Sequence, residues 1–272
     1  MNEQPYYGNV SGKNKIISSL KHLPLANEEI KDVPQISFKS LTFDYFPYPI
    51  GFLSNVISRN FYNELAKSFP SIDDLKSFSD MGQKYLLSEN SDNKKFYQFL
   101  SLSEPWAKFY KIIKSVNFVR YILTILRHNN IDLGISHFPI LFDNNLGEIP
   151  HLTTRFEFSI LLNGGYHLPH TDIPKKLVSI VISFSDKSEW INENKGGTST
   201  CLPIKKSLIF NQVNKYRSFE DVKIIKRYPF IENSGILLIK TYNSWHCVEP
   251  IQVSDSQIRK SIVIQLIRND LF

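Results

Sequence analysis

The sequence has little of what marks disulfide-rich, zinc-finger or membrane proteins. Its 272 residues include only two cysteines, Cys201 and Cys247, too few for a disulfide framework or a cysteine zinc site. No run of about 18 apolar residues predicts a membrane span, and residues 1–20 lack the apolar stretch of a signal peptide. We therefore expect a cytoplasmic protein whose two cysteines are buried thiols.

Concentrated positive charge is also missing, although the formal net charge is +6. Lysines and arginines are scattered singly or in pairs, and no arginine-rich arm or uninterrupted basic helix occurs. A nucleic-acid partner is therefore not expected. The excess instead predicts a surface that mildly attracts anionic substrates. Hydrophobic residues make up 42% of the chain, which is ample for a packed core.

The chain divides into three parts, which we expect to form one integrated domain. Residues 1–40 are a polar lead-in with one short helix near residues 15–20. Residues 41–136 are expected to be helical and to pack on the core. Ser58 is a candidate N-cap for a helix that ends before Pro70, and a broad apolar face predicts further helix within residues 103–130.

From residue 137 to residue 272 the pattern is that of β-structure. Short β-branched or aromatic runs alternate with clusters of Gly, Asn, Ser and Pro, and none is followed by a crossover helix. The fold class is therefore expected to be mainly β with flanking helices (α+β), with the strands in an antiparallel sandwich or barrel. The predicted strands are residues 154–162, 176–184, 206–212, 234–242 and 259–267.

Four residues form a pattern that predicts a metal site. His170 and Asp172 stand two apart after a Gly-rich turn, His246 follows 74 residues beyond Asp172, and Arg259 opens a strand 13 residues later. Two imidazoles and one carboxylate are the facial triad of non-haem Fe(II) oxygenases. Alternation along a strand would aim His170 and Asp172 at one ion and turn Thr171 aside. An arginine nearby can bind the far carboxylate of a dicarboxylic keto acid.

Each of these residues also has a simpler interpretation. The carboxylate of Asp172 can cap backbone amides in a turn. His246 can be a hydrogen-bonded core histidine, and Arg259 can pair with a surface acid such as Asp255. The joint order of the residues favours the metal site over these separate explanations.

The chain resembles the 2-oxoglutarate- and Fe(II)-dependent dioxygenases of the prolyl-4-hydroxylase-like superfamily over roughly residues 150–268. The resemblance rests on HTD for the proximal ligands, GGTSTCLP for a Gly-Gly turn before an edge strand, WHCVEP for the distal histidine, and RKSIVIQLI for the arginine strand. Residues 47–71 resemble, more weakly, the entry helix of bacterial members. The resemblance implies a double-stranded β-helix (jelly roll) core that uses Fe(II), 2-oxoglutarate and O₂, with ascorbate as an optional reductant.

The same resemblance implies roles for individual residues. Fe(II) would be held by the metal ligands His170, Asp172 and His246, and 2-oxoglutarate by Arg259 and Ser261. Lys176 is a further candidate for contact with the cosubstrate. Arg155 is a candidate contact for the cosubstrate or the substrate. His167 is expected to be a loop residue or to support a metal ligand, and His151 is expected to be structural.

One departure bears on the substrate. Many prolyl hydroxylases of this superfamily carry a tyrosine on the strand before the HTD turn, where this chain has Ile160, Leu161 and Leu162. Residues 211–232 lengthen a connection between strands and are a candidate lid. The expected activity is hydroxylation of an unactivated C–H of a small molecule: a sugar, lipid or amino-acid precursor. The alternatives are a peptidyl prolyl hydroxylase, a cupin-like isomerase or zinc hydrolase, and a binding module without activity.

Overall fold

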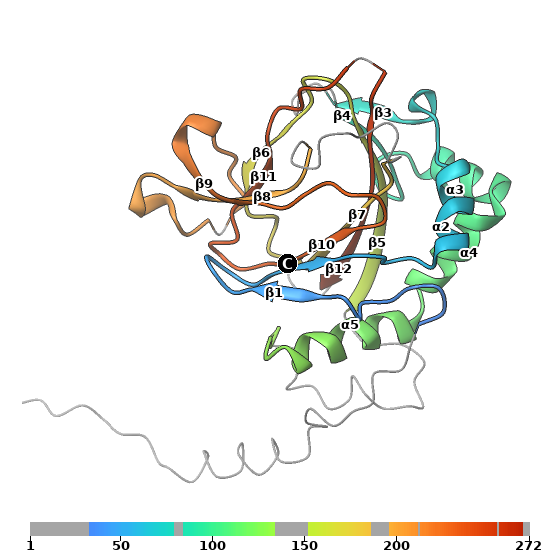
Figure 1. Cartoon of the computed structure of the whole chain (residues 1–272), viewed down its shortest axis with the longest axis horizontal. Coiled ribbons are helices and arrows are strands. Elements are labelled where there is room, and N and C mark those ends of the chain that lie inside the picture. Colours follow the sequence, from blue (N-terminus) through green and yellow to red (C-terminus); the bar gives the residue numbers. More distant parts are fainter. Residues whose placement is uncertain are drawn as a thin grey trace, which may run out of the picture.

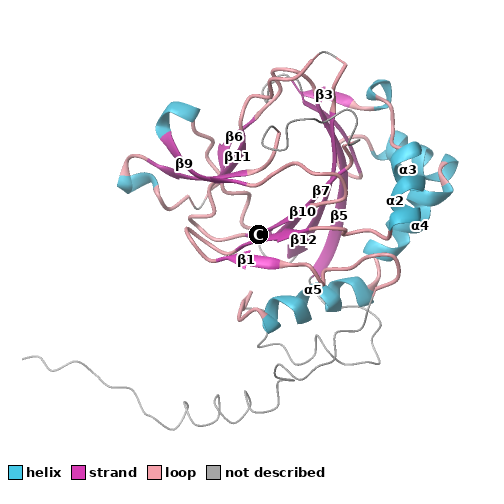
Figure 2. Cartoon of the chain, in the orientation of Figure 1, coloured by secondary structure: helices cyan, strands magenta, loops and turns pink. Residues whose placement is uncertain are grey.

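Two antiparallel sheets face each other, and helices cover the outer side of the larger sheet (Figures 1 and 2). The computed structural model describes residues 33–78, 84–133, 152–185, 196–211, 213–254 and 256–268. The helix expected near residues 15–20 lies outside the described residues, as does His151. The division into three parts stays a prediction.

The larger sheet has eight strands in the order β1-β2-β10-β7-β12-β5-β4-β3. Their bounds are β1 Thr42–Asp44, β2 Ile50–Leu53, β3 Lys76–Phe78, β4 Lys84–Ser88, β5 Leu152–Leu161, β7 Lys176–Ser183, β10 Gly235–Ile239 and β12 Arg259–Arg268. The smaller sheet has four strands in the order β6-β11-β8-β9. Their bounds are β6 His167–His170, β8 Ser199–Pro203, β9 Val222–Arg227 and β11 His246–Val248.

The strand order from β5 to β12 is that of a double-stranded β-helix. The chain crosses repeatedly between the sheets: β5, β7, β10 and β12 lie in the larger sheet, and β6, β8, β9 and β11 in the smaller one. Antiparallel pairing joins β10 to β7, β7 to β12 and β12 to β5, while β11 lies between β6 and β8. The predicted jelly-roll core, mainly β with flanking helices, is confirmed.

Four helices precede this core among the described residues. They are α2 Arg59–Lys67, α3 Asn93–Leu102, α4 Glu104–Ile113 and α5 Val116–His128. The helix α2 begins after Ser58, as expected. The long apolar stretch forms two helices because the Ser115 side chain accepts a hydrogen bond from the Phe118 amide and starts α5. No helix within the described ranges is long and apolar enough to cross a membrane.

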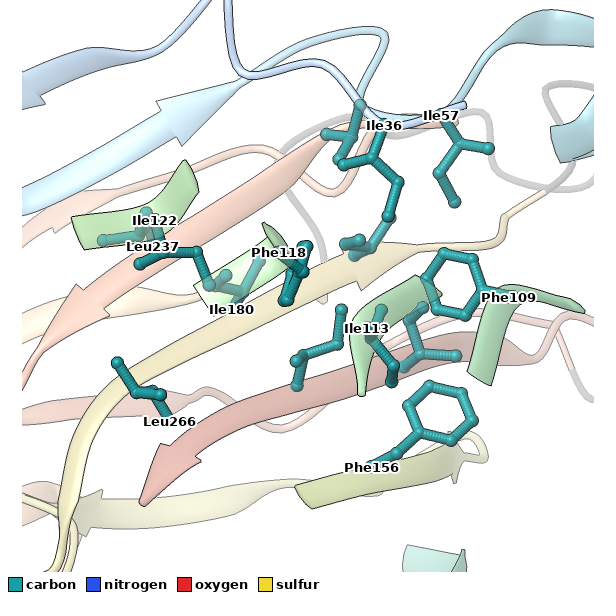
Figure 3. Packing of buried hydrophobic residues seen from close by; sticks show 14 of the residues in the cluster. Ile36, Ile57, Phe109, Ile113, Phe118, Ile122, Phe156, Ile180, Leu237 and Leu266 are labelled. Carbon is teal, nitrogen blue, oxygen red and sulfur yellow. The ribbon is translucent and has the colours of Figure 1, made fainter. Parts of the chain in front are cut away.

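The main hydrophobic core lies between the helices and the outer face of the larger sheet. Even-numbered residues of β5, β7 and β12 point outward into this core, and Phe156, Ile180 and Leu266 are each at most 1% exposed. Figure 3 shows Phe156 beside Phe109 and Ile113 of α4, and Ile180 and Leu266 belong to the same cluster. The odd-numbered residues therefore point inward, toward the smaller sheet.

Three expectations about strands need correction. Residues 206–212 do not form a strand: Lys206–Leu208 is a 3₁₀ helix, and Phe210 is 73% exposed, so this short apolar run has no sheet to join. The strand after the Gly-Gly turn, β8, is not at an edge, because β11 and β9 flank it. Strands β1 to β4 were not expected within residues 41–136, yet they extend the larger sheet on both sides.

Trp106 tests this packing. Its fully buried indole contacts the rings of Phe158 and Phe184 at centroid distances of 4.7 and 5.3 Å. We expect Trp106→Ala to lower the free energy of unfolding by about 3–5 kcal/mol, because the core cannot close the cavity left behind. Denaturant titration measures the change. The control Leu102→Ala, at a side chain 80% exposed, should stay within about 0.5 kcal/mol, and equal effects of the two substitutions would contradict this core.

Candidate metal centre

The two histidines of the candidate triad are cross-strand neighbours. His170 ends β6 and His246 begins β11, and the antiparallel register pairs them directly. Their ring centroids lie 4.3 Å apart. The pairing places two imidazoles 76 positions apart in the sequence on one end of the smaller sheet.

Asp172 reaches the same place through a turn rather than through a strand. β6 ends at His170, and Asp172 has a φ of +63°, in the left-handed region. The expected strand alternation is therefore wrong here, although Thr171 does turn aside and donates a hydrogen bond to the Asn211 carbonyl at 3.1 Å. Aspartate tolerates this left-handed conformation better than most residues do, which suits it to the position.

Hydrogen bonds to the backbone fix the orientation of both imidazoles. His170 Nδ1 lies 2.8 Å from the Leu168 carbonyl, and His246 Nδ1 lies 2.9 Å from the Ser244 carbonyl. Because a carbonyl can only accept, each Nδ1 carries the proton and each Nε2 keeps its lone pair. This is the arrangement by which proteins orient metal-binding histidines.

The three side chains fit a single metal ion. His170 Nε2 lies 3.8 Å from one oxygen of Asp172, and His246 Nε2 lies 4.0 Å from the other. The three ligand atoms lie within 4.8 Å of one another, and all three residues are buried. Burial lowers the pKa of both histidines, so they are neutral at neutral pH and able to donate a lone pair. Their role as ligands stays a prediction.

Asp172 is held as a carboxylate by two neighbours. Lys176 Nζ donates to Oδ1 at 2.7 Å, and Ser179 Oγ donates to Oδ2 at 3.0 Å. Burial, the largest single effect, would raise the pKa of Asp172, but the charge and hydrogen bond of Lys176 together with the two histidines outweigh burial and hold it well below its usual value. Although burial opposes it, Asp172 in turn raises the pKa of Lys176, so this pair stays ionised.

A cavity of about 240 Å³ opens beside the triad, between the two sheets. The inner face of the larger sheet forms one wall through Ser179 of β7 and through Arg259, Ser261 and Gln265 of β12. The alternation of β12 predicts this placement, because residues two apart share a face. Arg259 and Ser261, both predicted cosubstrate residues, therefore line the same cavity as the triad.

Arg259 is 4% exposed and makes no ion pair with any described residue. Its Nε donates to the Gly196 carbonyl at 2.5 Å and its Nη1 to Ser261 Oγ at 2.9 Å, while its guanidinium lies 4.5 Å from the centre of the Phe230 ring. Burial lowers its pKa to about 10, so it remains charged at neutral pH. Asp255, the alternative partner, lies outside the described residues.

The Gly-Gly turn brings the backbone up to this arginine. Gly196 has a φ of +72°, which favours glycine, and its carbonyl accepts the hydrogen bond from Arg259. A Cβ on Gly197 would lie 1.7 Å from the Tyr228 carbonyl oxygen. A larger residue would therefore be strained at Gly196 and would clash with the Tyr228 backbone at Gly197.

The other predicted contacts have different outcomes. Lys176 lines the cavity, but it donates to Asp172. His167 is not in a loop: it begins β6, lines the cavity and lies 4.2 Å from the His170 ring between centroids. Arg155 pairs with Gln265 and so shares the inner face, yet it is not among the residues that line the cavity.

The cavity residues that were not predicted from the sequence include Lys84, Glu157 and Tyr216. Lys84 of β4 and Glu157 of β5 line the wall, and Tyr216 stacks on the ring of His170 at 5.2 Å between centroids with an interplanar angle of 25°. The position of Glu157 could have been predicted from the sequence, because it shares the inner face with Ser159 in an alternating strand. The position of Lys84 could not, because it depends on the pairing of β4 with β5.

The candidate lid has two different parts in the described structure. Within its second half, Val222–Arg227 forms β9, the edge strand of the smaller sheet. Its first part holds Tyr216 against His170, and the amide of Arg217 donates to the Pro169 carbonyl at 3.0 Å. This contact places the segment at the rim of the cavity, and its role as a lid stays a prediction.

Comparison with solved structures finds remote likenesses. The chain is similar to a prolyl-4-hydroxylase from Pseudomonas putida, at 11% identity over 83% of this chain and 95% of that one, with a TM-score of 0.43. It is similar to a prolyl hydroxylase from Trichoplax adhaerens in complex with a hypoxia inducible factor peptide fragment (11% identity, 96% and 94% covered, TM-score 0.41). It is also similar to EvdO2 from Micromonospora carbonacea var. aurantiaca, at 9% identity over 81% of this chain and 86% of that one, with a TM-score of 0.41. No protein-family model and no curated protein matches the sequence.

The fold and the site together define a class: a double-stranded β-helix protein with a buried His-Asp-His group that lines its cavity. The solved structures named above are only 9–11% identical to the chain. These likenesses therefore do not assign an activity to the chain.

The triad predicts one Fe(II) per chain in anaerobically prepared protein. His170→Ala and His246→Ala should each remove most of that iron while the circular dichroism spectrum stays unchanged, because each substitution deletes one of three ligands. Metal analysis of the gel-filtered protein measures the iron. His167→Ala is the matched control and should keep its iron, since His167 is not part of the triad. Full iron content in both ligand variants would contradict the assignment.

Proposed function

We propose that the protein is an Fe(II)- and 2-oxoglutarate-dependent dioxygenase that hydroxylates an unactivated C–H of a small molecule. The observation that carries the proposal is Arg259, a buried cation without an acidic partner among the described residues, in the same cavity as the triad. A buried charge is costly unless it is paired. A dicarboxylic cosubstrate that binds the metal at one end supplies the missing carboxylate at the other.

Three residues would hold the metal, and the rest of its coordination sphere would stay open. His170, Asp172 and His246 would supply three ligands, and the remaining coordination positions would be available for a bidentate keto acid and for O₂. Bound Fe(II) supplies the activation of O₂ that couples oxidation of 2-oxoglutarate to succinate and CO₂ with hydroxylation of the substrate. The buried position of the triad excludes most water from this reaction.

The chain positions the cosubstrate through β12. The guanidinium of Arg259 offers parallel N–H donors to a carboxylate, and Ser261 Oγ lies beside it as a further hydrogen-bonding group. The Phe230 ring holds the guanidinium from one side. Leu161, directly opposite Arg259 on β5, offers no hydroxyl, so this pocket differs from one that includes a tyrosine at this place.

The size of the cavity favours a small substrate. A volume of about 240 Å³ lies below the usual range of small-molecule pockets, about 300 to 1,000 Å³. Tyr216, at the rim, is 40% exposed and stacks on His170, so an entering substrate meets an aromatic surface next to the metal ligand. A peptidyl proline at the rim remains the alternative substrate.

Arg259 tests the cosubstrate separately from the metal. Loss of one side of a buried charge-assisted pair costs about 2–5 kcal/mol, or roughly 30-fold to several thousandfold in affinity. We therefore expect Arg259→Ala to weaken 2-oxoglutarate binding at least tenfold while the Fe(II) content stays near wild type. The 2-oxoglutarate affinity of Arg259→Lys should lie between those of the wild type and Arg259→Ala, because lysine keeps the charge and loses the planar guanidinium. Titration of the iron–keto acid absorption band measures the affinity.

Lys260 is the matched control on the opposite face of β12. It pairs with Ile160 of the outward-facing set, so Lys260→Ala should leave 2-oxoglutarate affinity within about twofold of wild type. An unchanged Arg259→Ala together with a weakened Lys260→Ala would mean that the cosubstrate lies elsewhere. Thermal unfolding of both variants separates loss of a ligand contact from loss of the fold.

Turnover distinguishes the proposal from the non-oxidative alternatives. We expect the iron-loaded protein to form succinate from 2-oxoglutarate in the presence of O₂, faster when a true substrate is added from a small-molecule panel. Omission of either Fe(II) or O₂ should abolish succinate formation. Activity that needs neither 2-oxoglutarate nor O₂, and that Zn(II) supports as well as Fe(II), would instead favour a hydrolase or isomerase.

A further inference from the structure

The cavity continues beyond the jelly-roll strands, along the inner face of the extended larger sheet. Phe78 of β3 and Lys84 and Leu86 of β4 line this part, together with Glu157 of β5. The pairing of β4 with β5 places Lys84 opposite Leu161, and Leu161 is opposite Arg259. Lys84 and Arg259 therefore stand in one row on the same face, on either side of Leu161.

Lys84 is a buried ammonium that its surroundings only partly compensate. The residue is 8% exposed, and the nearest described carboxylate oxygen, on Glu157, is 4.0 Å from Nζ, beyond hydrogen-bonding distance. No hydrogen bond from Nζ to a described residue is present. Burial lowers the pKa of Lys84 because the attraction of Glu157 does not fully replace the lost hydration. An anionic group of a ligand would replace the hydration that Lys84 loses on burial.

The sum of the charges around the cavity also favours an anionic ligand. Among the described lining residues, Lys84, Lys176 and Arg259 are basic, and Glu157 and Asp172 are acidic. Asp172 is paired with Lys176, and 2-oxoglutarate would bring two negative charges against the two positive charges of Fe(II). The loaded cavity then keeps an excess of one positive charge. A neutral or cationic substrate leaves this excess buried, whereas a monoanion balances it.

We infer, on the basis of the proposed dioxygenase function, that the substrate is a small molecule with a carboxylate or similar anionic group that binds Lys84. Its apolar part would lie against Phe78 and Leu86, which line the same arm of the cavity. Leu161 separates this site from the cosubstrate site at Arg259. Lys84 is thus a specificity-determining residue, and Glu157 sets how strongly its charge is available to the ligand.

The test compares acids with their neutral amides. Hexanoate and phenylacetate, each paired with its primary amide, are titrated by anaerobic calorimetry into wild-type protein saturated with Fe(II) and 2-oxoglutarate. We expect each acid to bind at least tenfold more tightly than its amide. Lys84→Met should weaken binding of the acids at least tenfold, change that of the amides by less than twofold, and leave 2-oxoglutarate affinity within twofold.

Two further variants keep the result interpretable. Glu157→Gln removes the competing carboxylate, so the acids should bind more tightly, and this variant keeps the lysine in place. Lys260→Met removes a lysine from the opposite face of the sheet and should change none of the affinities. Thermal unfolding of all variants verifies that they are folded, and Lys84→Gln replaces Lys84→Met if the latter is not.

Several outcomes would overturn the inference. The wild-type protein could bind the acids no more tightly than the amides. The preference for the acids could persist in Lys84→Met, or the acids could bind more weakly to Glu157→Gln than to the wild type. A tenfold loss of 2-oxoglutarate affinity in Lys84→Met would assign Lys84 to the cosubstrate instead. Wild-type protein that binds no 2-oxoglutarate contradicts the proposed function, and the acid–amide comparison on protein loaded with Fe(II) alone then tests Lys84 independently.

Discussion

The two-residue period of the larger sheet governs both the stability and the chemistry of this molecule. In β5, β7 and β12 every second side chain packs against the helices, and those between face the cavity. Phe158 and Ile264 belong to the first set, while Ser159 and Gln265 belong to the second. A shift of one residue in any strand pairing would bury polar groups in the main core and fill the cavity with apolar ones. The helices therefore support the site indirectly, by fixing the register.

The smaller sheet contributes the opposite wall and most of the triad. Its strands are short, and β6 and β11 are held beside each other by a register that pairs His170 with His246. Each imidazole is fixed by a carbonyl of its own chain segment, so the two Nε2 atoms point toward Asp172 without help from a distant element. Lys176 on Oδ1 of the carboxylate and Ser179 on Oδ2 leave further lone pairs on each oxygen for a metal. Preorganisation of this kind lowers the cost of metal binding.

How much the sequence predicted depended on the length of each pattern. The long alternating strands β5, β7 and β12 were predictable because one apolar face repeats over eight or ten residues. The three- to five-residue strands β1 to β4 were not, because Gly51 interrupts β2 and buried Lys84 begins β4. The order of His170, Asp172 and His246 indicated the triad, since four strands fill the interval between Asp172 and His246. Lys84 and Tyr216 were missed because only tertiary contacts bring them to the cavity.

Leu161 lies between the two buried cations Arg259 and Lys84, so the proposed cosubstrate and substrate carboxylates would bind at separate sites. A hydroxyl at this position would lie between Arg259 and Lys84 and allow hydrogen bonds to run from one cation to the other. The leucine side chain, 2% exposed and packed with Phe230, offers no such bridge, so each cation needs its own counter-charge. Two like charges in a buried cavity repel, and each stays ionised most easily when an anion occupies its own side.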